Sequence, residues 1–405
     1  MIRAIMAPLL LTILVTFASP AHALSLQDEK LRIDFKLIFQ SRGTLVLEAG
    51  DSDGNPYDPL RGSSGEPEPI RFDIRPIRFG MGIRYGDHWK AFIMFRSEKL
   101  DLNNPAAFNR LLHLFLANAE FAFKTGAVEH ALHFGLDKAW NTESNFPAWS
   151  NLFPSDRIVA VRSEVRGVGI GYMLRGPFFN LGADVQNNNT GVKDKQASNL
   201  SGAEDTNGFF YSGRIEVAPT PEWLLTRKVE SYAGEKGTGL LLGFDMQFNA
   251  GNLDDDQSDM TFTRSDILTF GPDLLIHWDG LSALAEFRWR RTLKEVVPDA
   301  GGATTSALSK GTFWDVQAGY AIPIGDFAVE LALGYARLDN DADVISTPVY
   351  GGGTDNGPDG NTITTGLNLY FDGHTNKLQL AYQGWRAEGG LGRADIIRLQ
   401  HQISF

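Results

Sequence analysis

The chain has 405 residues, no cysteine and a formal net charge of −12, and 43% of its residues are hydrophobic. The absence of cysteine excludes disulfide frameworks and thiolate metal sites. We expect no cofactor, no bound metal and no nucleic-acid partner. Composition alone fits a soluble secreted domain as well as a membrane protein, so the arrangement of strands and loops has to decide between them.

The N-terminus has the layout of a secretory signal peptide. A basic residue is followed by an apolar run over 5–18, which is shorter than the about 20 residues that a membrane-spanning helix needs. Residues 20–23 carry the small-x-small pattern of a signal peptidase site. We expect export through the Sec pathway and cleavage after Ala23, which leaves 24–405 as the mature chain. The alternative, an amphipathic anchor or a buried helix, is disfavoured because the segment has no polar face.

The rest of the chain contains no second long apolar run, which excludes a helical membrane protein. Many segments instead alternate apolar and polar residues over nine or ten positions, the length that a tilted strand needs to cross a bilayer. In a soluble sandwich the apolar face would form the core. In an outer-membrane barrel the apolar face meets lipid and the polar face lines the lumen. The periodicity does not separate these two interpretations.

The pattern predicts sixteen strands, and an even number is what bacterial single-chain barrels require. The expected strands are residues 31–40, 77–85, 88–97, 112–124, 129–137, 160–174, 178–186, 208–218, 238–249, 266–278, 281–291, 311–321, 326–338, 362–371, 376–386 and 393–405.

The lengths of the connections favour the membrane barrel. Connections after even-numbered strands are mostly tight, namely 86–87, 125–126, 176–177, 279–280, 323–325 and 372–373. Connections after odd-numbered strands are mostly long and polar, namely 41–76, 138–159, 187–207, 250–265, 292–310 and 339–361. Short turns on one rim and long loops on the other are typical of outer-membrane barrels, whereas a sandwich has no reason to sort its loops in this way. We therefore expect an all-β fold, a transmembrane antiparallel β-barrel of about 16 strands.

Three features do not fit this pattern cleanly. The connection 219–237 follows an even-numbered strand but is long. The alternation slips near Gly167, which predicts a bulge. Pro272 lies inside an expected strand, although proline cannot donate to the strand ladder.

Aromatic residues gather beside the short turns, where an interfacial girdle would lie. They are Tyr85, Trp89, Phe178, Phe179, Trp278, Tyr320, Phe327, Tyr370 and Phe371. The chain ends on Phe405 after an amphipathic strand, and this ending resembles the outer-membrane assembly signal. We therefore expect the barrel-assembly machinery to be a partner.

Several stretches resemble the phosphate-selective porin O and P family. They are residues 72–89, 118–123, 132–135, 365–371, 378–382 and the closing strand. The resemblance is diffuse but covers most of the mature chain. It implies a sixteen-stranded channel, commonly trimeric, in which lumen arginines and loop lysines draw anions inward. The lysine cluster of that family is not found here, because the loops are acidic, as at 254–256, and this departure argues against phosphate selectivity.

The candidate functional residues are basic side chains on the polar faces of the expected strands. They are Arg78, Arg84, Lys90, Arg96, Arg214, Arg288, Arg290 and Arg398. Guanidinium groups suit phosphate and carboxylate oxygens, and charged rings are how such pores select ions. The alternative is that these residues pair with carboxylates on neighbouring strands, namely Glu164, Asp184, Glu216, Asp245 and Glu286.

The connection 138–159 is unusually aromatic for a solvated loop. We expect it to fold inward and to form the constriction, and the residues assigned to it are Lys138, Trp140, Trp149 and Arg157. The alternative is packing at a contact between subunits. The acidic run 254–259 offers oxygen ligands for Ca²⁺ but lacks the spacing of a known calcium loop, so a solvated charge run is favoured.

The predicted function is passive diffusion of small hydrophilic solutes through a porin in the outer membrane of a Gram-negative cell. An anion preference is expected, and the alternative is a general or cation-leaning porin. A structural barrel is the alternative from another class. No nucleophile motif or metal-spaced histidine pair is present, so we do not expect an enzyme. The expected partners are outer-membrane lipid, small ions and solutes, and two further copies in a homotrimer.

Overall fold

The computed structural model describes residues 25–51, 70–74, 77–97, 100–101, 113–138, 153, 166–187, 209–220, 238–256, 261–298, 305–340, 360–388 and 392–404. Its strands are β1 (Ser25–Gln27), β2 (Leu31–Asp51), β3 (Ile70–Ile74), β4 (Arg78–Tyr85), β5 (Trp89–Arg96), β6 (Leu100–Asp101), β7 (His113–Thr125), β8 (Val128–Lys138), β9 (Arg166–Arg175), β10 (Phe179–Asn187), β11 (Phe209–Val217), β12 (Thr238–Asp256), β13 (Thr261–Trp278), β14 (Leu281–Pro298), β15 (Thr305–Ile324), β16 (Phe327–Asn340), β17 (Gly360–Asp372), β18 (Asn376–Ala387) and β19 (Gly392–Ser404).

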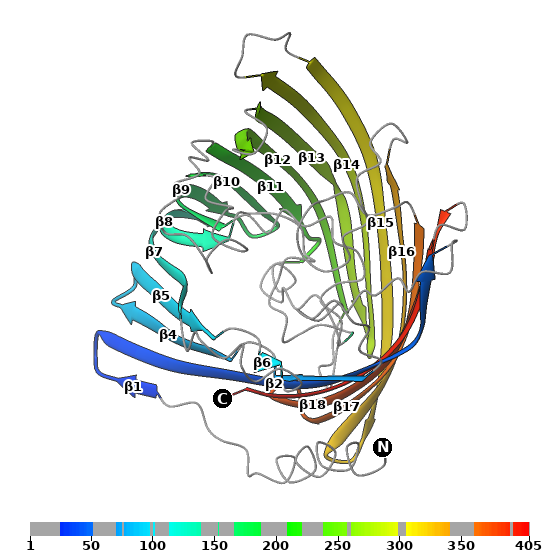
Figure 1. The fold of residues 1–405 in the computed structure, drawn as a ribbon. Helices are drawn as coiled ribbons and strands as arrows, with labels where there is room; N and C mark the ends of the chain where they lie inside the picture. The colour runs from blue at the N-terminus through cyan, green and yellow to red at the C-terminus, as the bar shows by residue number, and fades with distance from the viewer. Residues whose placement is uncertain are drawn as a thin grey trace.

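These elements form one closed antiparallel barrel of sixteen strands (Figure 1). The nineteen strands occupy sixteen positions around the barrel because the short strands β1, β3 and β6 each continue the line of a longer strand. β3 and β4 both pair with β2, and β6 prolongs β5, since β3 pairs with β6 where β4 pairs with β5. β1 lies on the same edge of β2 as β19. The predicted fold class is therefore confirmed.

The barrel closes where the last long strand meets the first. β19 pairs with β2 from Gly392↔Asp51 to Ser404↔Ile38. β1 takes up the same edge further along β2, with Ser25 opposite Asp34. The seam is thus completed by segments from both ends of the chain, and closure leaves no long unpaired edge, which a sheet in lipid cannot tolerate.

The tight turns lie where the sequence predicted them. Gly86, Gly126, Gly325 and Gly373 have φ values of 57°, 63°, 61° and 49° at these turns, and glycine adopts such angles without steric cost. Between β13 and β14, Asp279 and Gly280 both have positive φ, at 43° and 90°, as a two-residue type I′ turn requires. The turns therefore share one rim of the barrel.

Several strands at the other rim are longer than the sequence indicated. β2 continues through residues 41–51, and β12 and β13 form a hairpin that extends into the expected loop 250–265. β14 and β15 likewise extend into the expected loop 292–310. The predicted loops are wrong in these parts, because residues that lie beyond a bilayer still complete their backbone hydrogen bonds in a strand ladder and need no apolar alternation to do so.

Pro272 is accommodated inside β13. Its neighbour Phe244 on β12 stays in register, while the ladder with β14 is interrupted between Phe270 and Asp273 and resumes in the same register. The missing N–H thus removes a local pairing without moving the strand. The connection after β11 is long, as the sequence indicated, and residues 221–237 lie outside the described residues. The bulge expected near Gly167 is not found in the described part of the chain, where residues 166–175 of β9 pair with β8 in unbroken register.

Burial identifies which face of the sheet meets the surroundings. On β12, Asp245 and Gln247 are 0% and 3% exposed, whereas Phe244 and Met246 are 43% and 52% exposed. The same inversion recurs on β10, β11, β17 and β18. A soluble sandwich would bury the apolar face. An exposed apolar belt around a polar interior is the pattern of a membrane barrel, so burial decides what periodicity could not.

The aromatic residues at the turn rim mostly point outward, as a girdle requires. Exposed members are Tyr85, Trp89, Phe178, Trp278, Tyr320, Phe327 and Phe371. Tyr370 was expected among them, and this is wrong. It is 1% exposed and donates its hydroxyl to Glu330 at 2.5 Å, because strand alternation turns it inward beside Phe371. No helix within the described residues is long and apolar enough to cross a membrane.

Candidate functional site: the inner wall of the barrel

Basic side chains are concentrated on the inward face of β2, β4 and β5. We call this set the basic wall; it comprises Arg32, Lys36, Arg42, Arg78, Arg84, Lys90 and Arg96. Asp34 and Asp73 are the described carboxylates on the inward face of β2–β5. The alternation of β4 and β5 places their basic residues directly opposite one another, since Arg78 pairs with Arg96 and Arg84 with Lys90.

One buried carboxylate lies on the inward face of each strand from β10 to β16. This carboxylate wall comprises Asp184, Glu216, Asp245, Asp273, Glu286, Asp315 and Glu330, all of them buried. Arg214, Arg288 and Arg290 lie on the inward faces of β11 and β14 within it. Burial of this many charged groups costs free energy unless they are paired or hydrogen-bonded.

The two walls lie on opposite sides of the barrel. Going round the ring from β4, the eighth strand reached is β13, which is half of a sixteen-stranded circuit. Figure 1 shows β4 and β5 on one side and β13 and β14 on the other. Positive and negative charges therefore face one another across the interior rather than alternating around it.

Arg214 and Arg288 belong to an ion-pair network on the carboxylate wall. Arg214 donates from Nη1 and Nη2 to the two oxygens of Asp273, at 2.6 and 2.9 Å, and from Nε to Glu216 at 2.7 Å. Nη2 of Arg288 lies 2.8 Å from Asp245 and 3.2 Å from Asp273. The side chains of all these residues are at most 3% exposed. For these two arginines the structure shows the alternative that the sequence left open, pairing with carboxylates.

Arg288 is also held by the backbone. Its Nη1 donates to the carbonyl oxygens of Pro272, at 2.9 Å, and Phe287, at 3.0 Å. The first bond lies where the β13–β14 ladder is interrupted, so the guanidinium occupies an acceptor at that interruption. These bonds fix Arg288 as part of the carboxylate wall. Arg290 lies two residues further along β14 and is half-buried.

A second network lies near the turn rim on β5, β7, β8 and β9. Lys90 donates to Glu120 at 2.9 Å. Arg175 donates to both oxygens of Glu120, at 3.1 and 2.6 Å, and also to Glu129. Lys90 and Arg84 keep exposed side chains beside this network. The sequence identified Lys90 but missed Arg175, although Arg175 shares the inward parity of β9.

The other end of the basic wall combines charge with apolar surface. The guanidinium carbons of Arg78 and Arg96 lie 5.7 and 5.1 Å from the centroid of the Phe115 ring. Phe115 is the extra residue of a bulge in β7, between the partners of Met94 and Phe95. The bulge turns this phenyl ring inward, which strand alternation alone does not predict.

Amide side chains cover the inward face where β17, β18, β19 and β2 meet. Gln40 donates to Gln402 at 2.6 Å, and Arg42 donates to Gln400 from Nε and Nη2, at 3.2 and 3.0 Å. Arg398 donates to Gln383. The sequence analysis did not single out these glutamines, although their shared parity with Arg398 was the available signal.

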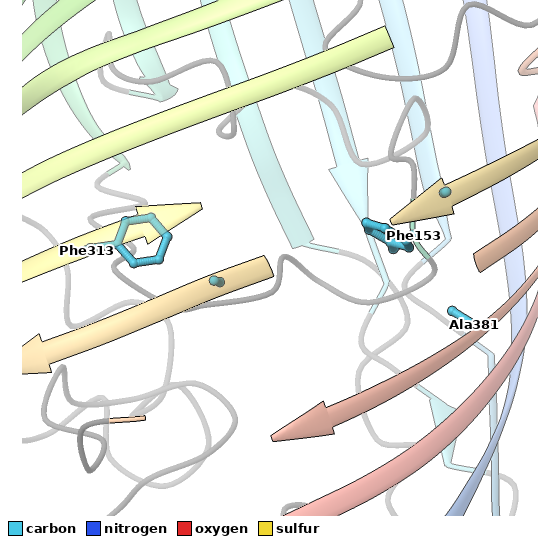
Figure 2. Packing of buried hydrophobic residues seen from close by; sticks show 5 residues of the cluster. Phe153, Phe313 and Ala381 are labelled. Carbon is cyan, nitrogen blue, oxygen red and sulfur yellow. The ribbon is translucent and has the colours of Figure 1, made fainter. Parts of the chain in front are cut away.

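Phe153, from the aromatic segment 138–159, packs inside the barrel. It is 3% exposed and belongs to one buried apolar cluster with Phe313, Ala332, Ala336 and Ala381, which lie on the inward faces of β15, β16 and β18. Figure 2 shows Phe153 beside these strands, with Phe313 and Ala381 belonging to the same cluster. On β17, a Cβ added to Gly366 would lie 3.1 Å from the ring. Small residues therefore make room on the wall for this one side chain.

The remaining predicted site residues fall outside what the structure describes. Trp140, Trp149, Arg157 and Phe405 are not among the described residues, and only the backbone of Lys138, the last residue of β8, is described.

Comparison with known proteins gives a fold and no closer relationship. No protein-family model matches the sequence, and no curated protein matches it either. The structure is similar to OmpF of Salmonella typhi, with a TM-score of 0.52, 12% identity and coverage of 94% of this chain and 100% of that chain. It is also similar to the outer membrane channel DcaP of Acinetobacter baumannii, with a TM-score of 0.50, 14% identity and coverage of 94% and 99%.

These identities are low enough that the likeness concerns the fold alone. The resemblance to the phosphate-selective porin O and P family stays a prediction. With a closed sixteen-stranded ring, an outward apolar belt and a polar interior, the chain has the fold of the outer-membrane porins.

Proposed function

We propose that the protein is an outer-membrane porin through which small hydrophilic solutes diffuse passively, with a preference for anions. The observation that carries this proposal is the basic wall of β2, β4 and β5, beside which Asp34 on β2 and Asp73 on β3 are the described inward carboxylates of β2–β5. Anions moving along that wall meet a succession of donors, from Arg84 and Lys90 near the turn rim to Arg78 and Arg96 further in.

The wall outweighs the acidic loops for a physical reason. Charges on solvated loops would be screened by salt within about 8–10 Å. Charges inside a narrow barrel act on a passing ion at shorter range and lower effective dielectric constant. The basic residues proposed to favour anions are then Arg78, Arg84 and Arg96; Lys90 lies on the same wall but donates to Glu120, which reduces its contribution. Arg288, which is engaged by carboxylates, contributes less than the sequence indicated.

A general or cation-leaning porin is the second candidate, and the carboxylate wall favours it. Arg214 and Arg288 are shared among Glu216, Asp245 and Asp273, so that side of the barrel keeps a negative excess. A structural barrel without transport gains no support from a particular residue. Phosphate as the preferred anion rests on the sequence resemblance only.

We further propose that segment 138–159 narrows the pore. Phe153 supports this, because its ring is packed against the inward faces of β15–β18. Export after cleavage at Ala23 and assembly by the barrel-assembly machinery through Phe405 complete the proposal and rest on the sequence pattern. A homotrimeric state is proposed from the resemblance to the porin O and P family.

The test is the reversal potential of single channels in a planar bilayer under a KCl gradient. The proposal requires a potential on the anion-selective side for the unmodified protein. The double variant Arg78→Gln/Arg84→Gln should shift the reversal potential toward cation selectivity. Asp315→Asn, on the carboxylate wall, should shift it toward anion selectivity. Cation selectivity of the unmodified channel would contradict the anion preference and leave the second candidate.

A further inference from the structure

Two positively charged side chains lie directly opposite one another on the outer face of the barrel. Arg291 on β14 and Lys310 on β15 are cross-strand partners, and both are exposed. Trp289 and Leu293, two residues before and after Arg291, are 40% and 38% exposed on the same face. Like charges placed directly opposite one another destabilise a strand pair, so an anion bound between them would stabilise this one.

Within the described part of the chain, neither of these two side chains has an ion-pair or hydrogen-bond partner. Asp266, a carboxylate on the adjoining strand β13, lies opposite Leu293 and not opposite Arg291. Another outward-facing arginine differs in this respect, since Arg337 on β16 lies 2.8 Å from Glu388. The described residues therefore leave both charges open to a ligand from outside the barrel.

The position of Arg291 along its strand places it at the edge of the bilayer. It lies ten residues after Leu281, where β14 leaves the turn rim. At a rise of about 3.4 Å per residue and a tilt of about 35–45°, ten residues climb about 24–28 Å. The apolar band of outer-membrane barrels is about 25 Å tall. The guanidinium group is thus at the level of the lipid headgroups on the side away from the turns.

Exposed tryptophans mark the same boundary independently. Trp289 and Trp314 are 40% and 50% exposed on the outer faces of β14 and β15, closer to the turn rim than Arg291 and Lys310. The Phe287 ring joins them, with its centroid 4.1 Å from that of Trp289 and 4.7 Å from that of Trp314. Tryptophan is enriched where hydrocarbon meets water. A ligand here therefore meets aromatic surface on its bilayer side and two positive charges beyond it.

We propose that Arg291 and Lys310, with Trp289 and Trp314, form a binding site for the phosphate-bearing headgroup of a lipid in the outer leaflet. The phosphate accepts hydrogen bonds from the forked guanidinium group and from the ammonium group, and the lipid body lies against the tryptophan rings. A lipid is the occupant because these side chains face the bilayer and not the lumen. The long connections of such barrels lie on the extracellular side, which selects the outer leaflet. The site goes beyond the proposed channel function and does not depend on ion selectivity.

The experiment counts lipids retained by the barrel in detergent, by native mass spectrometry. The probes are dioleoyl phosphatidic acid, whose phosphate is uncovered, and dioleoyl phosphatidylcholine, which has the same chains but a choline over its phosphate. Phosphatidic acid should be retained at a concentration at least about fivefold lower, the effect of one basic group at a membrane surface. Equal retention of the two lipids would overturn the proposal.

Inorganic phosphate distinguishes a lipid site from a site for the free ion. It carries the charge without the apolar body, so at the concentration of phosphatidic acid it should not displace the lipid. Displacement at equal concentration would show that the tryptophan surface contributes nothing and would refute a lipid site.

Matched variants locate the site. Arg291→Gln and Lys310→Gln should each lower the preference for phosphatidic acid about fivefold, and Arg291→Lys should keep most of it. The control is Arg337→Gln, which changes the net charge equally and lies ten residues after Phe327, the first residue of β16. Because Glu388 already engages Arg337, that variant should alter the preference less than about twofold. Heat-modifiable migration on a gel confirms that each variant is folded. Equal losses in Arg291→Gln and Arg337→Gln would show an effect of net charge and would refute the assigned site.

Discussion

Arg214 on β11 and Asp273 on β13 form a two-point ion pair across the intervening strand β12, with nitrogen–oxygen distances of 2.6 and 2.9 Å. The pair passes over Gly243, the residue of β12 that lies directly opposite Asp273. A Cβ on Gly243 would collide with the Asp273 carboxylate and the Arg214 guanidinium. This crossing is thus possible because one position of the middle strand has no side chain.

Removal of Arg214 should destabilise the barrel strongly. Arg214→Gln leaves Glu216, Asp245 and Asp273 with Arg288 as their remaining arginine in this network, and breaking a buried pair costs roughly 3–5 kcal/mol. The measurement is the denaturant midpoint of unfolding in detergent, followed by heat-modifiable migration on a gel. The control is Arg32→Gln, whose pair with Asp34 is partly exposed and contributes at most about 1 kcal/mol. Similar shifts in the two variants would show that the network is not a main source of stability.

Gly243→Ala should disturb the same network without removing a charge. The added methyl group has to displace either Asp273 or Arg214, and both are fixed by several hydrogen bonds. We expect a lower unfolding midpoint. The corresponding loss in the free energy of unfolding is about 1–3 kcal/mol, which is typical of overpacking. The control is Gly213→Ala on β11, where the nearest atom to an added Cβ is 3.7 Å away. If Gly243→Ala is as stable as the control, the crossing is looser than the distances indicate.

Truncation of Phe153 should increase single-channel conductance. Phe153→Ala removes a ring that belongs to a buried apolar cluster on the inner wall and lies close to Gly366 of β17. Without that anchor, segment 138–159 should obstruct the pore less. Phe209→Ala removes an outward-facing ring that is 52% exposed and should leave conductance unaltered. A conductance in Phe153→Ala equal to that of the unmodified channel would argue against the proposed constriction.

Replacement of Arg288 tests which wall controls selectivity. In Arg288→Gln, Asp245 and Asp273 lose one positive partner, so the channel should shift toward cations because carboxylates gain influence. Asp245→Asn should shift the reversal potential in the opposite direction. If Arg288→Gln leaves the reversal potential unmoved, the carboxylate wall does not act on passing ions.

Phe405 should be needed for assembly. Phe405→Asp is expected to leave little barrel in the outer membrane, because β19 and β2 must pair to close the seam and an open edge is not tolerated in lipid. The assay is the amount of heat-modifiable protein in outer-membrane fractions, with Phe405→Tyr as the conservative control. Normal surface levels of Phe405→Asp would show that the last residue is not an assembly signal.

Strand periodicity and connection length were enough to predict the architecture. Strand alternation and the sorting of short and long connections predicted the sixteen-stranded barrel and its turn rim, because membrane crossing imposes a fixed strand length and a two-residue period. It also located Arg78, Arg84, Lys90 and Arg96 on one face of their strands. Periodicity reports parity only, so it carried no information on which side chains meet across strands.

The environment of each charged side chain depends on tertiary contacts, which the sequence pattern does not report. In the sequence pattern Arg84, Arg214 and Arg288 all lie on the polar face of their strands. In the structure Arg214 and Arg288 lie among buried carboxylates, whereas Arg84 stays exposed. The difference arises from register and ring position, which place Asp245 and Asp273 within reach of both arginines. The bulge that turns Phe115 under Arg78 and Arg96 is likewise a property of strand pairing. Ion pairs and aromatic contacts depend on distances of a few ångströms between distant segments, and closure of the barrel sets those distances.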